Sequence, residues 1–362
     1  MRESAAERHD RLLGLVRERG SARVSELAGR LGVSAVTVRR DVEELAGRGL
    51  LDRVHGSVSW PREKGGPAAP AGVGGGLVLG MLAPSATYYF AEVIRGAHEA
   101  AARAGARLIL RISDYRPEED QARTEGLLAA GAEGLLVAPG WRRPGDPAAY
   151  GDWITSLPVP TVLLERQPVP GSPLDGLDRV CSDHRHGVLL AVRHLMELGH
   201  GPPLLMARDD SPTALAVRSG YAEALGVLGV RAPQEVIDSV PAEVHPDRFE
   251  AAVQALRAAV ASGAATAALI HNDVDAIQVV QRLAELGVRV PRDLALIAYD
   301  DEVAALADTP LTAVAPPKHE VGRHATGLLV ERLGQERGSD GEAPQRHLTL
   351  LPQLRVRASC GA

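Results

Sequence analysis

A hydroxyl group and two guanidinium groups lie close together near the start of the chain. Thr37, Arg39 and Arg40 belong to the segment SAVTVRR, which covers residues 34–40. Arginine can donate two hydrogen bonds to a guanine edge, while threonine and small apolar side chains contact other base edges. The segment is therefore a candidate for reading base pairs in the major groove of DNA.

A short helix would position these groups. Ser34 is a typical N-cap residue, and Val38, Val42 and Leu45 recur at helical spacing, so they share one face that must pack inward. Val36 and Arg40 then point outward, with Thr37 and Arg39 beside them. Two further helical patterns precede this one, and Gly32 suits the turn between the second and third helices. The spacing predicts a helix-turn-helix.

An alternating segment follows the third helix. Residues 50–58 read LLDRVHGSV, in which apolar and polar residues alternate around Gly56. We interpret this as a two-stranded wing. Arg53 and His55 would lie where such a wing meets the sugar-phosphate backbone, so we expect them to bind phosphate without reading sequence.

The segment VSELAGRLGVSAVTVRRDVEELAGRGLLDRVHGSVS resembles the DeoR-type winged helix, which has a T-[IV]-R-R-D-[LV] helix and an R-x-H-G-G wing. The resemblance covers residues 8–60, and it departs from the family pattern at Ser57, where a second glycine is usual. It implies sequence-specific binding of double-stranded DNA through Ser34, Val36, Thr37, Arg39, Arg40, Arg53 and His55. The alternative is a winged helix that binds protein and carries a solvated arginine pair.

Composition excludes several classes of protein. The net charge of the whole chain is −6. Residues 1–60 nevertheless hold 11 Arg against 9 acidic residues, so this part is slightly basic and the rest of the chain is acidic. Cys181 and Cys360 are too few for a disulfide framework. The chain has no apolar run long enough to span a membrane and no basic-then-apolar start, so we expect a cytoplasmic protein.

Residues 61–76 contain nine Gly or Pro and no apolar periodicity. We interpret them as a linker between a DNA-binding domain, residues 1–60, and a larger domain, residues 77–362. In the larger domain, short apolar runs alternate with amphipathic stretches, which predicts an α/β fold of parallel sheets flanked by helices. Some 280 residues are more than one hydrophobic core usually contains, so this pattern favours two lobes with a cleft between them.

The glycines at positions 74, 76 and 80 do not make a dinucleotide site, because they precede a strand instead of following one. The chain contains no P-loop, nucleophile-elbow or zinc-protease motif. We therefore expect no enzyme activity, no cofactor and no metal.

The larger domain resembles the effector domain of the lactose-repressor family, which is similar to periplasmic sugar-binding proteins. The resemblance covers residues 77–357 and rests on segments such as GLLVAP (134–139), HNDVDAI (271–277) and VPRDLALIAYDD (290–301). It implies a two-lobed body with a small sugar-like effector bound at the carboxyl ends of the strands. The effector contacts it implies are Tyr88, Tyr89, Trp141, Glu165, Arg166, Asp183, Arg218, Asn272 and Asp300.

Simpler roles remain open for several of these residues. Trp141 is equally explained as a loop tryptophan packed on its own loop, and Asn272 and Asp300 as N-caps of the helices that follow. Members of the lactose-repressor family also have a hinge helix between the DNA-binding domain and the effector domain. Residues 61–76 would not form such a helix, because nine of these sixteen residues are Gly or Pro.

Together these features predict a cytoplasmic, sugar-responsive transcriptional regulator. We expect a repressor that acts as a homodimer, because two heads read paired half-sites. The alternatives are a sugar-binding receptor without a regulatory role and a sugar-handling enzyme.

Overall fold

The computed structural model divides into two compact units, residues 1–75 and residues 76–362. In the first unit it describes residues 9, 11–13, 15–16, 21–31, 33, 37–38, 41–42, 45, 52–54 and 57–59, with the backbone alone for 21–26 and for the last two segments. In the second unit it describes residues 76–143, 145–230, 236–336 and 344–362. The predicted linker lies almost wholly outside these residues.

The first unit has a small helical core beside an antiparallel sheet. Leu12, Val16, Leu27, Leu31, Val38, Val42 and Leu45 pack together in it. The predicted inward face of the third helix is therefore confirmed. Helix α2 (Val24–Leu31) matches the predicted second helix. The sheet has strand order β1-β3-β2, made by β1 (Ser21–Arg23), β2 (Asp52–Val54) and β3 (Ser57–Ser59).

The wing thus has one strand more than the sequence predicted. The three residues before α2 pair with β3, and a strand of three residues is too short for its alternation to be recognised in the sequence. Among the predicted DNA contacts, Thr37 lies in a helical segment and Arg53 in the middle of β2. Ser34, Val36, Arg39, Arg40 and His55 lie outside the described residues.

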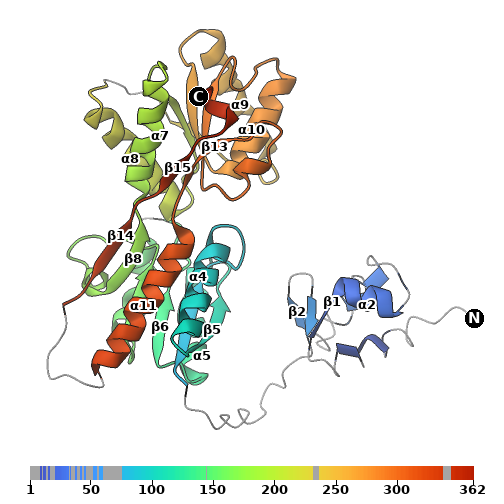
Figure 1. Ribbon diagram of the computed structural model, residues 1–362, viewed down its shortest axis with the longest axis vertical. Coiled ribbons are helices and arrows are strands. Elements are labelled where there is room, and N and C mark those ends of the chain that lie inside the picture. The colour runs from blue at the N-terminus through green and yellow to red at the C-terminus, as the bar shows by residue number, and fades with distance from the viewer. Residues whose placement is uncertain are drawn as a thin grey trace, which may run out of the picture. The chain divides into compact units, whose positions relative to one another are not determined.

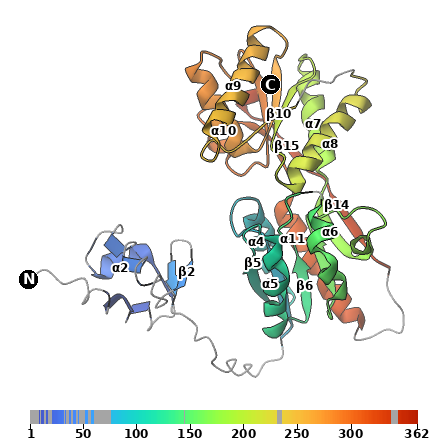
Figure 2. The same cartoon turned by 180° about the vertical axis from the view of Figure 1, so that it is seen from behind.

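The first lobe of the second unit is built on a six-stranded sheet (Figures 1 and 2), with strand order β14-β8-β7-β6-β4-β5 and parallel pairing throughout. Its strands are β4 (Val78–Ala83), β5 (Arg107–Ile112), β6 (Gly134–Val137), β7 (Thr161–Leu164), β8 (Asp178–Ser182) and β14 (His347–Leu350). Alternate residues of a strand face opposite sides. Leu79 and Met81 accordingly pack under helices α4 (Tyr89–Arg103) and α11 (Lys318–Glu336), whereas Leu82 packs on the side of α5 (Pro117–Ala129).

The loops on the α5 side of this sheet include α6 (Asp146–Tyr150) and the short 3₁₀ helices η1 (Asp152–Ser156) and η2 (Pro173–Gly176). Ile154 and Leu174 from these turns complete the core on that side.

The second lobe repeats this plan with strand order β10-β9-β11-β12-β13-β15. Its strands are β9 (Leu204–Ala207), β10 (Ile237–Asp238), β11 (Ala267–His271), β12 (Ala295–Tyr299), β13 (Thr312–Ala315) and β15 (Gln353–Arg355), and only β15 pairs antiparallel. Helices α7 (His184–Glu197) and α8 (Pro212–Val227) cover one face, and α9 (Pro246–Ala261) and α10 (Asp273–Glu285) cover the other. The turns η3 (Ala304–Leu306) and η4 (Ala358–Cys360) close this lobe.

The chain passes between the two lobes three times. It crosses between β8 and α7, returns between β13 and α11, and crosses again between β14 and β15 (Figure 1). The predicted architecture of two α/β lobes with parallel sheets is confirmed. The third crossing was not predicted, because residues 347–355 have neither a clear period nor a helix between the strands.

Helices α4 and α11 approach each other unusually closely. Gly96 of α4 lies against the backbone of His319, and Gly322 of α11 lies against the backbone of Val93. A Cβ atom at either glycine would overlap the facing carbonyl oxygen. These two positions therefore require glycine because backbone, which cannot rotate away, occupies the space.

We expect Gly96→Ala to destabilise the second unit by at least ~2 kcal/mol, because the added methyl group forces the two helices apart. Urea unfolding followed by circular dichroism measures the loss. Gly327→Ala on α11 is the matched control, since a Cβ there meets nothing within 4 Å. It should instead stabilise by up to ~1 kcal/mol through helix propensity. Equal midpoints for the two variants would contradict the close packing.

Candidate functional site

A cavity of about 180 Å³ opens where the strands of both lobes end. Many of its wall residues lie at the carboxyl ends of strands or in the loops that follow them. Tyr88 follows β4, Tyr115 follows β5, Glu165 follows β7, Arg208 follows β9 and Asp300 follows β12. Open α/β sheets bind ligands at this edge, because side chains emerge there from strand-to-helix loops.

The structure brings six of the nine predicted effector contacts to this first cavity. They are Tyr88, Tyr89, Glu165, Arg166, Asn272 and Asp300. Trp141 and Asp183 instead line a second cavity of about 300 Å³, which Glu165 and Arg166 also line. Trp141 is only 3% exposed and packs into the core of the first lobe. The Asp183 carboxylate accepts a hydrogen bond from the His186 amide and caps α7.

Arg218 lines neither cavity. Its guanidinium donates to the backbone oxygens of Ala207 and Arg208, at 2.5 and 2.7 Å, and pairs with Asp238 at 2.6 Å. It therefore holds the end of β9 against β10. These three acceptors, at the ends of β9 and β10, set the direction of the Arg218 side chain.

Glu165 contributes a carboxylate from the first lobe to the wall of this cavity. It accepts from the Tyr89 hydroxyl at 2.8 Å, and from the Ser182 hydroxyl and amide at 2.8 and 2.9 Å. Burial, together with the negative charge of Glu165, raises the pKa of Tyr89 well above its ordinary value, so the phenol stays protonated and donates. Glu165 thereby ties α4, β7 and β8 together at the cavity wall.

A tyrosine connects the two lobes. The Tyr88 hydroxyl, from the loop after β4, lies 2.5 Å from Asp273 Oδ1 and 3.2 Å from Asp300 Oδ2 in the second lobe. The other oxygen of Asp273 accepts from the amides of residues 302, 303 and 304, which fixes the loop after β12. Tyr88 therefore donates to a rigid acceptor, and this contact holds the lobes together.

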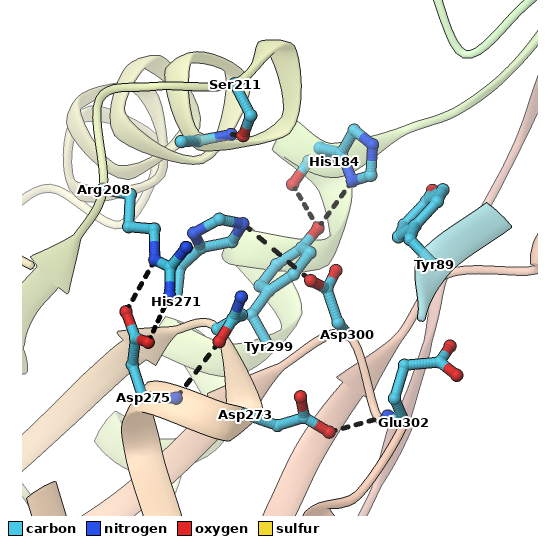
Figure 3. Close-up of polar contacts among 12 residues, drawn as sticks. Tyr89, His184, Arg208, Ser211, His271, Asp273, Asp275, Tyr299, Asp300 and Glu302 are labelled. Carbon is cyan, nitrogen blue, oxygen red and sulfur yellow. Dashed lines mark hydrogen bonds and ion pairs between the residues drawn. The ribbon is translucent and has the colours of Figure 1, made fainter. Parts of the chain in front are cut away.

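Asp300 and His271 are buried side by side in the second lobe (Figure 3). Asp300 directly follows β12, and His271 is the last residue of β11. Desolvation raises the pKa of Asp300 to about 6, although Lys318 opposes that shift. Desolvation lowers the pKa of His271 to about 4, so its imidazole is neutral near pH 7. Among the described residues, Asp300 Oδ1 and His271 Nδ1 have no hydrogen-bond partner. A ligand hydroxyl group is the kind of partner that two such atoms need.

Two arginines have fixed positions at the first cavity. Arg166 is buried, and it donates to the carbonyl oxygens of Pro139 and Glu165, the latter at 2.8 Å. Burial lowers its pKa from the ordinary arginine value. Arg208 forms a two-pronged ion pair with Asp275 at 2.5 and 2.8 Å (Figure 3), and Ser239 also donates to Asp275.

Four cavity residues adopt backbone conformations that side chains disfavour. Their φ values are 52° at Tyr88, 55° at Tyr115, 50° at Glu165 and 92° at Asp300. Non-glycine residues in this left-handed region carry conformational strain, which is concentrated at ligand sites and switch regions. The strain supports a binding role for this cavity.

Sequence reasoning missed Tyr115, Arg208 and His271 as cavity residues. Arg208 directly follows β9, His271 ends β11 and Tyr115 lies three residues after β5, so the signal was present. Polar residues at strand ends are common in any parallel sheet, and spacing alone did not indicate which of them face inward.

No group of three or more His, Cys, Asp or Glu side chains suited to a metal occurs in the part of the chain that the structure describes. Among the described helices, none has the length and apolarity to cross a membrane.

Two family models match the chain. Residues 8–64 match the DeoR-like helix-turn-helix domain, and residues 192–360 match the periplasmic binding protein-like domain. The predicted head and body types are both confirmed.

A relative from Halalkalibacterium halodurans, named arabinose metabolism transcriptional repressor, is 24% identical over 92% of this chain and 89% of its own length. The lac repressor dimer bound to operator and an anti-inducer has the same fold, with a TM-score of 0.63, 22% identity, and 81% of this chain and 96% of that chain covered. A LacI family regulator from Enterococcus faecium with bound ribose gives a TM-score of 0.59, with 21% identity, and 78% and 98% covered.

We expect Tyr88→Phe to shift the body toward an open arrangement, because it removes both hydroxyl contacts with the second lobe. Hydrogen bonds to charged acceptors are worth about 1.5–3 kcal/mol. Small-angle X-ray scattering of the second unit measures the change as a larger radius of gyration. Tyr150→Phe is the control, since Tyr150 is 41% exposed and lines neither cavity. Identical scattering from Tyr88→Phe and wild type would refute the contact as a closing device.

Proposed function

We propose that this chain, which joins a DeoR-like helix-turn-helix domain to a periplasmic-binding-protein-like body of the lactose-repressor type, represses transcription under the control of a small sugar-like effector. The observation that carries this proposal is the presence in one chain of a packed helix-turn-helix core and a polar cavity between two lobes. The names of the relatives, which include an arabinose repressor, support it.

The proposal assigns DNA recognition to the third helix and the wing. Val38, Val42 and Leu45 are buried, so the core of the first unit takes up one face of the third helix. We assign base contacts to Val36, Thr37, Arg39 and Arg40 and phosphate contacts to Ser34, Arg53 and His55. Arg53 lies in β2, which pairs with β3 as a wing requires.

The proposal assigns effector binding to the first cavity. Sugars offer hydroxyl groups that donate to carboxylates and accept from amides, and they present apolar ring faces to aromatic side chains. Asp300 and His271 supply unpaired polar atoms among the described residues, and Tyr88 and Tyr115 supply aromatic surface. A ribose-bound regulator with the same fold supports a ligand of this class.

The chain is proposed to act as a homodimer in the cytoplasm. Two heads are needed to read paired half-sites on DNA. A dimer on its operator is the form of the lac repressor structure that this body resembles.

A binding function is favoured over catalysis. The carboxylate of Glu165 accepts three hydrogen bonds from neighbouring protein groups, so it serves to hold the cavity wall in place. The relatives are named as regulators. Incubation with the bound sugar, followed by mass spectrometry, separates the two functions, because a regulator leaves the sugar unchanged.

Arg40→Ala should weaken operator binding by about 1–3 kcal/mol and relax the preference at one base pair, because one bidentate contact with guanine is lost. Arg53→Ala should weaken binding to all DNA alike and reduce the salt slope by about one unit. Fluorescence anisotropy on an operator selected from a random library measures both. If Arg53→Ala changed the preference at one base pair, the wing assignment would be wrong.

Effector affinity should fall as pH drops through about 6, because the raised pKa of Asp300 means that this carboxylate then gains a proton and loses acceptor capacity. At one pH unit below the pKa, only about a tenth of the carboxylate is ionised, so we expect about a tenfold weaker Kd at pH 5 than at pH 7.5. His271 stays neutral over this range. Calorimetry with a sugar found by screening pentoses and hexoses measures the profile.

Asp300→Asn is the matched control for that experiment. It keeps the size of the side chain and removes the titrating group, so its affinity should be lower at pH 7.5 and flat down to pH 5. A wild-type profile that is also flat would remove Asp300 from the effector site.

A further inference from the structure

Lys318 is a buried lysine behind the wall of the first cavity. It is the first residue of α11, directly after the second passage of the chain between the lobes, and it is only 6% exposed. A lysine is seldom buried to this extent unless its charge is paired. The residue lines neither cavity. Any effect of Lys318 on a ligand must therefore pass through the residues that it contacts.

Lys318 contacts both lobes. Its ammonium group donates to the backbone oxygen of Asp300 and forms an ion pair with Glu302, and both acceptors lie in the loop after β12 of the second lobe. The same ammonium group lies 5.2 Å from the ring centre of Tyr89, which belongs to α4 of the first lobe. A cation at this distance is attracted to the face of an aromatic ring. Lys318 thus joins the wall of the first lobe to the loop that carries Asp300.

The loop after β12 has a strained backbone. Asp300 and Asp301 have φ values of 92° and 55°, in the left-handed region that side chains disfavour. Such residues persist where the surrounding structure holds them in place. Arg357 holds the Asp301 carboxylate at 2.6 and 3.1 Å, and Lys318 holds the backbone oxygen of Asp300 and the side chain of Glu302. The direction of the Asp300 side chain therefore depends in part on Lys318.

Lys318 also affects the charge of Asp300. The other titratable groups that face the Asp300 carboxyl are Tyr88, Asp273, His184 and His271. Burial raises the pKa of Asp300 to about 6, and Lys318 is the neighbour that opposes this rise most strongly. Burial lowers the pKa of both histidines, so Lys318 is the main cation beside Asp300 near pH 7.

We propose that Lys318 is a positioning residue of the effector site, which holds the loop after β12 against the first lobe and keeps Asp300 in place as a hydrogen-bond acceptor for the effector. This inference rests on the proposed function, because it takes the first cavity as the effector site. It adds a residue outside the cavity, at a passage between the lobes, on which effector binding near neutral pH depends.

The first test is the pH dependence of effector binding by Lys318→Met, measured by calorimetry from pH 5 to pH 9 with the tightest-binding sugar from a screen of pentoses and hexoses. Methionine keeps the length of the side chain and removes its charge. Because an adjacent opposite charge commonly shifts a carboxyl pKa by about 1–3 units, the midpoint of the profile should rise by at least about one unit. At pH 6.5 the variant should then bind at least about threefold more weakly than the wild type, and this difference should narrow toward pH 9.

A purely structural role predicts a different profile, with the same loss of affinity at every pH. An unshifted midpoint in Lys318→Met would therefore overturn the inference. Lys318→Arg keeps a cation, so its midpoint should stay near that of the wild type even where its affinity falls. Arg323→Met is the matched control, because it removes another cation of α11 that pairs with Glu320 and lines neither cavity. Its whole profile should match the wild type.

Isotope labelling tests the contact without a ligand and without a change at Lys318. The sequence contains two lysines, Lys64 and Lys318, so a Lys64→Arg protein labelled with ¹³Cε-lysine gives a single lysine signal in NMR spectra. This signal should shift as Asp300 titrates near pH 6. The shift should persist in Glu302→Gln, which removes the other carboxyl group, and disappear in Asp300→Asn. A signal that is unaffected by Asp300→Asn would count against the inference.

Failure of the inference and failure of the proposed function remain distinguishable. If a sugar binds and releases the operator while Lys318→Met keeps the wild-type midpoint, only the inference fails. If no saccharide binds or affects operator binding, both fail.

Discussion

A carboxylate that leaves water must gain hydrogen-bond donors, and this constraint organises the cleft between the lobes. Asp273 accepts three backbone amides and a phenol, Glu165 accepts a phenol, a hydroxyl and an amide, and Asp275 accepts an arginine and a serine. Each of these networks joins elements that are distant in the sequence. The walls of the cleft are therefore fixed before a ligand arrives, which reduces the entropy lost on binding.

The networks also distinguish the groups that hold the structure from the groups left for a ligand. Arg218 and Asp183, with their acceptors and donors close by, belong to the first kind. Asp300 Oδ1 and His271 Nδ1 lack partners among the described residues and belong to the second. Tyr88 belongs to both, since it lines the cavity and also joins the lobes. Ligand contact and lobe closure thus depend on one side chain, which is a simple physical route from binding to a change of shape.

Sequence patterns predicted most of the strands and helices because apolar periodicity survives without tertiary information. The inward residues of the third helix, Val38, Val42 and Leu45, are an example. The contribution of α11 to the first lobe was not predictable in this way, since it depends on backbone contact at Gly96 and Gly322, more than 200 residues apart.

The site was partly predictable, because it lies at the ends of strands. Strand-end positions such as Glu165 and Asp300 are visible in the sequence, but the direction of Arg218 and the depth of Trp141 depend on neighbouring loops.

The triple passage of the chain between the lobes has a consequence for synthesis on the ribosome. The sheet of the first lobe is complete to β8 at residue 182, but α11, which covers one of its faces, begins at residue 318. At about 5–20 residues per second, roughly 7–27 seconds separate the two. During that interval the apolar face under α11 is exposed to water, while the second lobe is being made. The nascent chain therefore needs protection from aggregation at that stage, and chaperone binding is expected to concentrate on the unfinished first lobe.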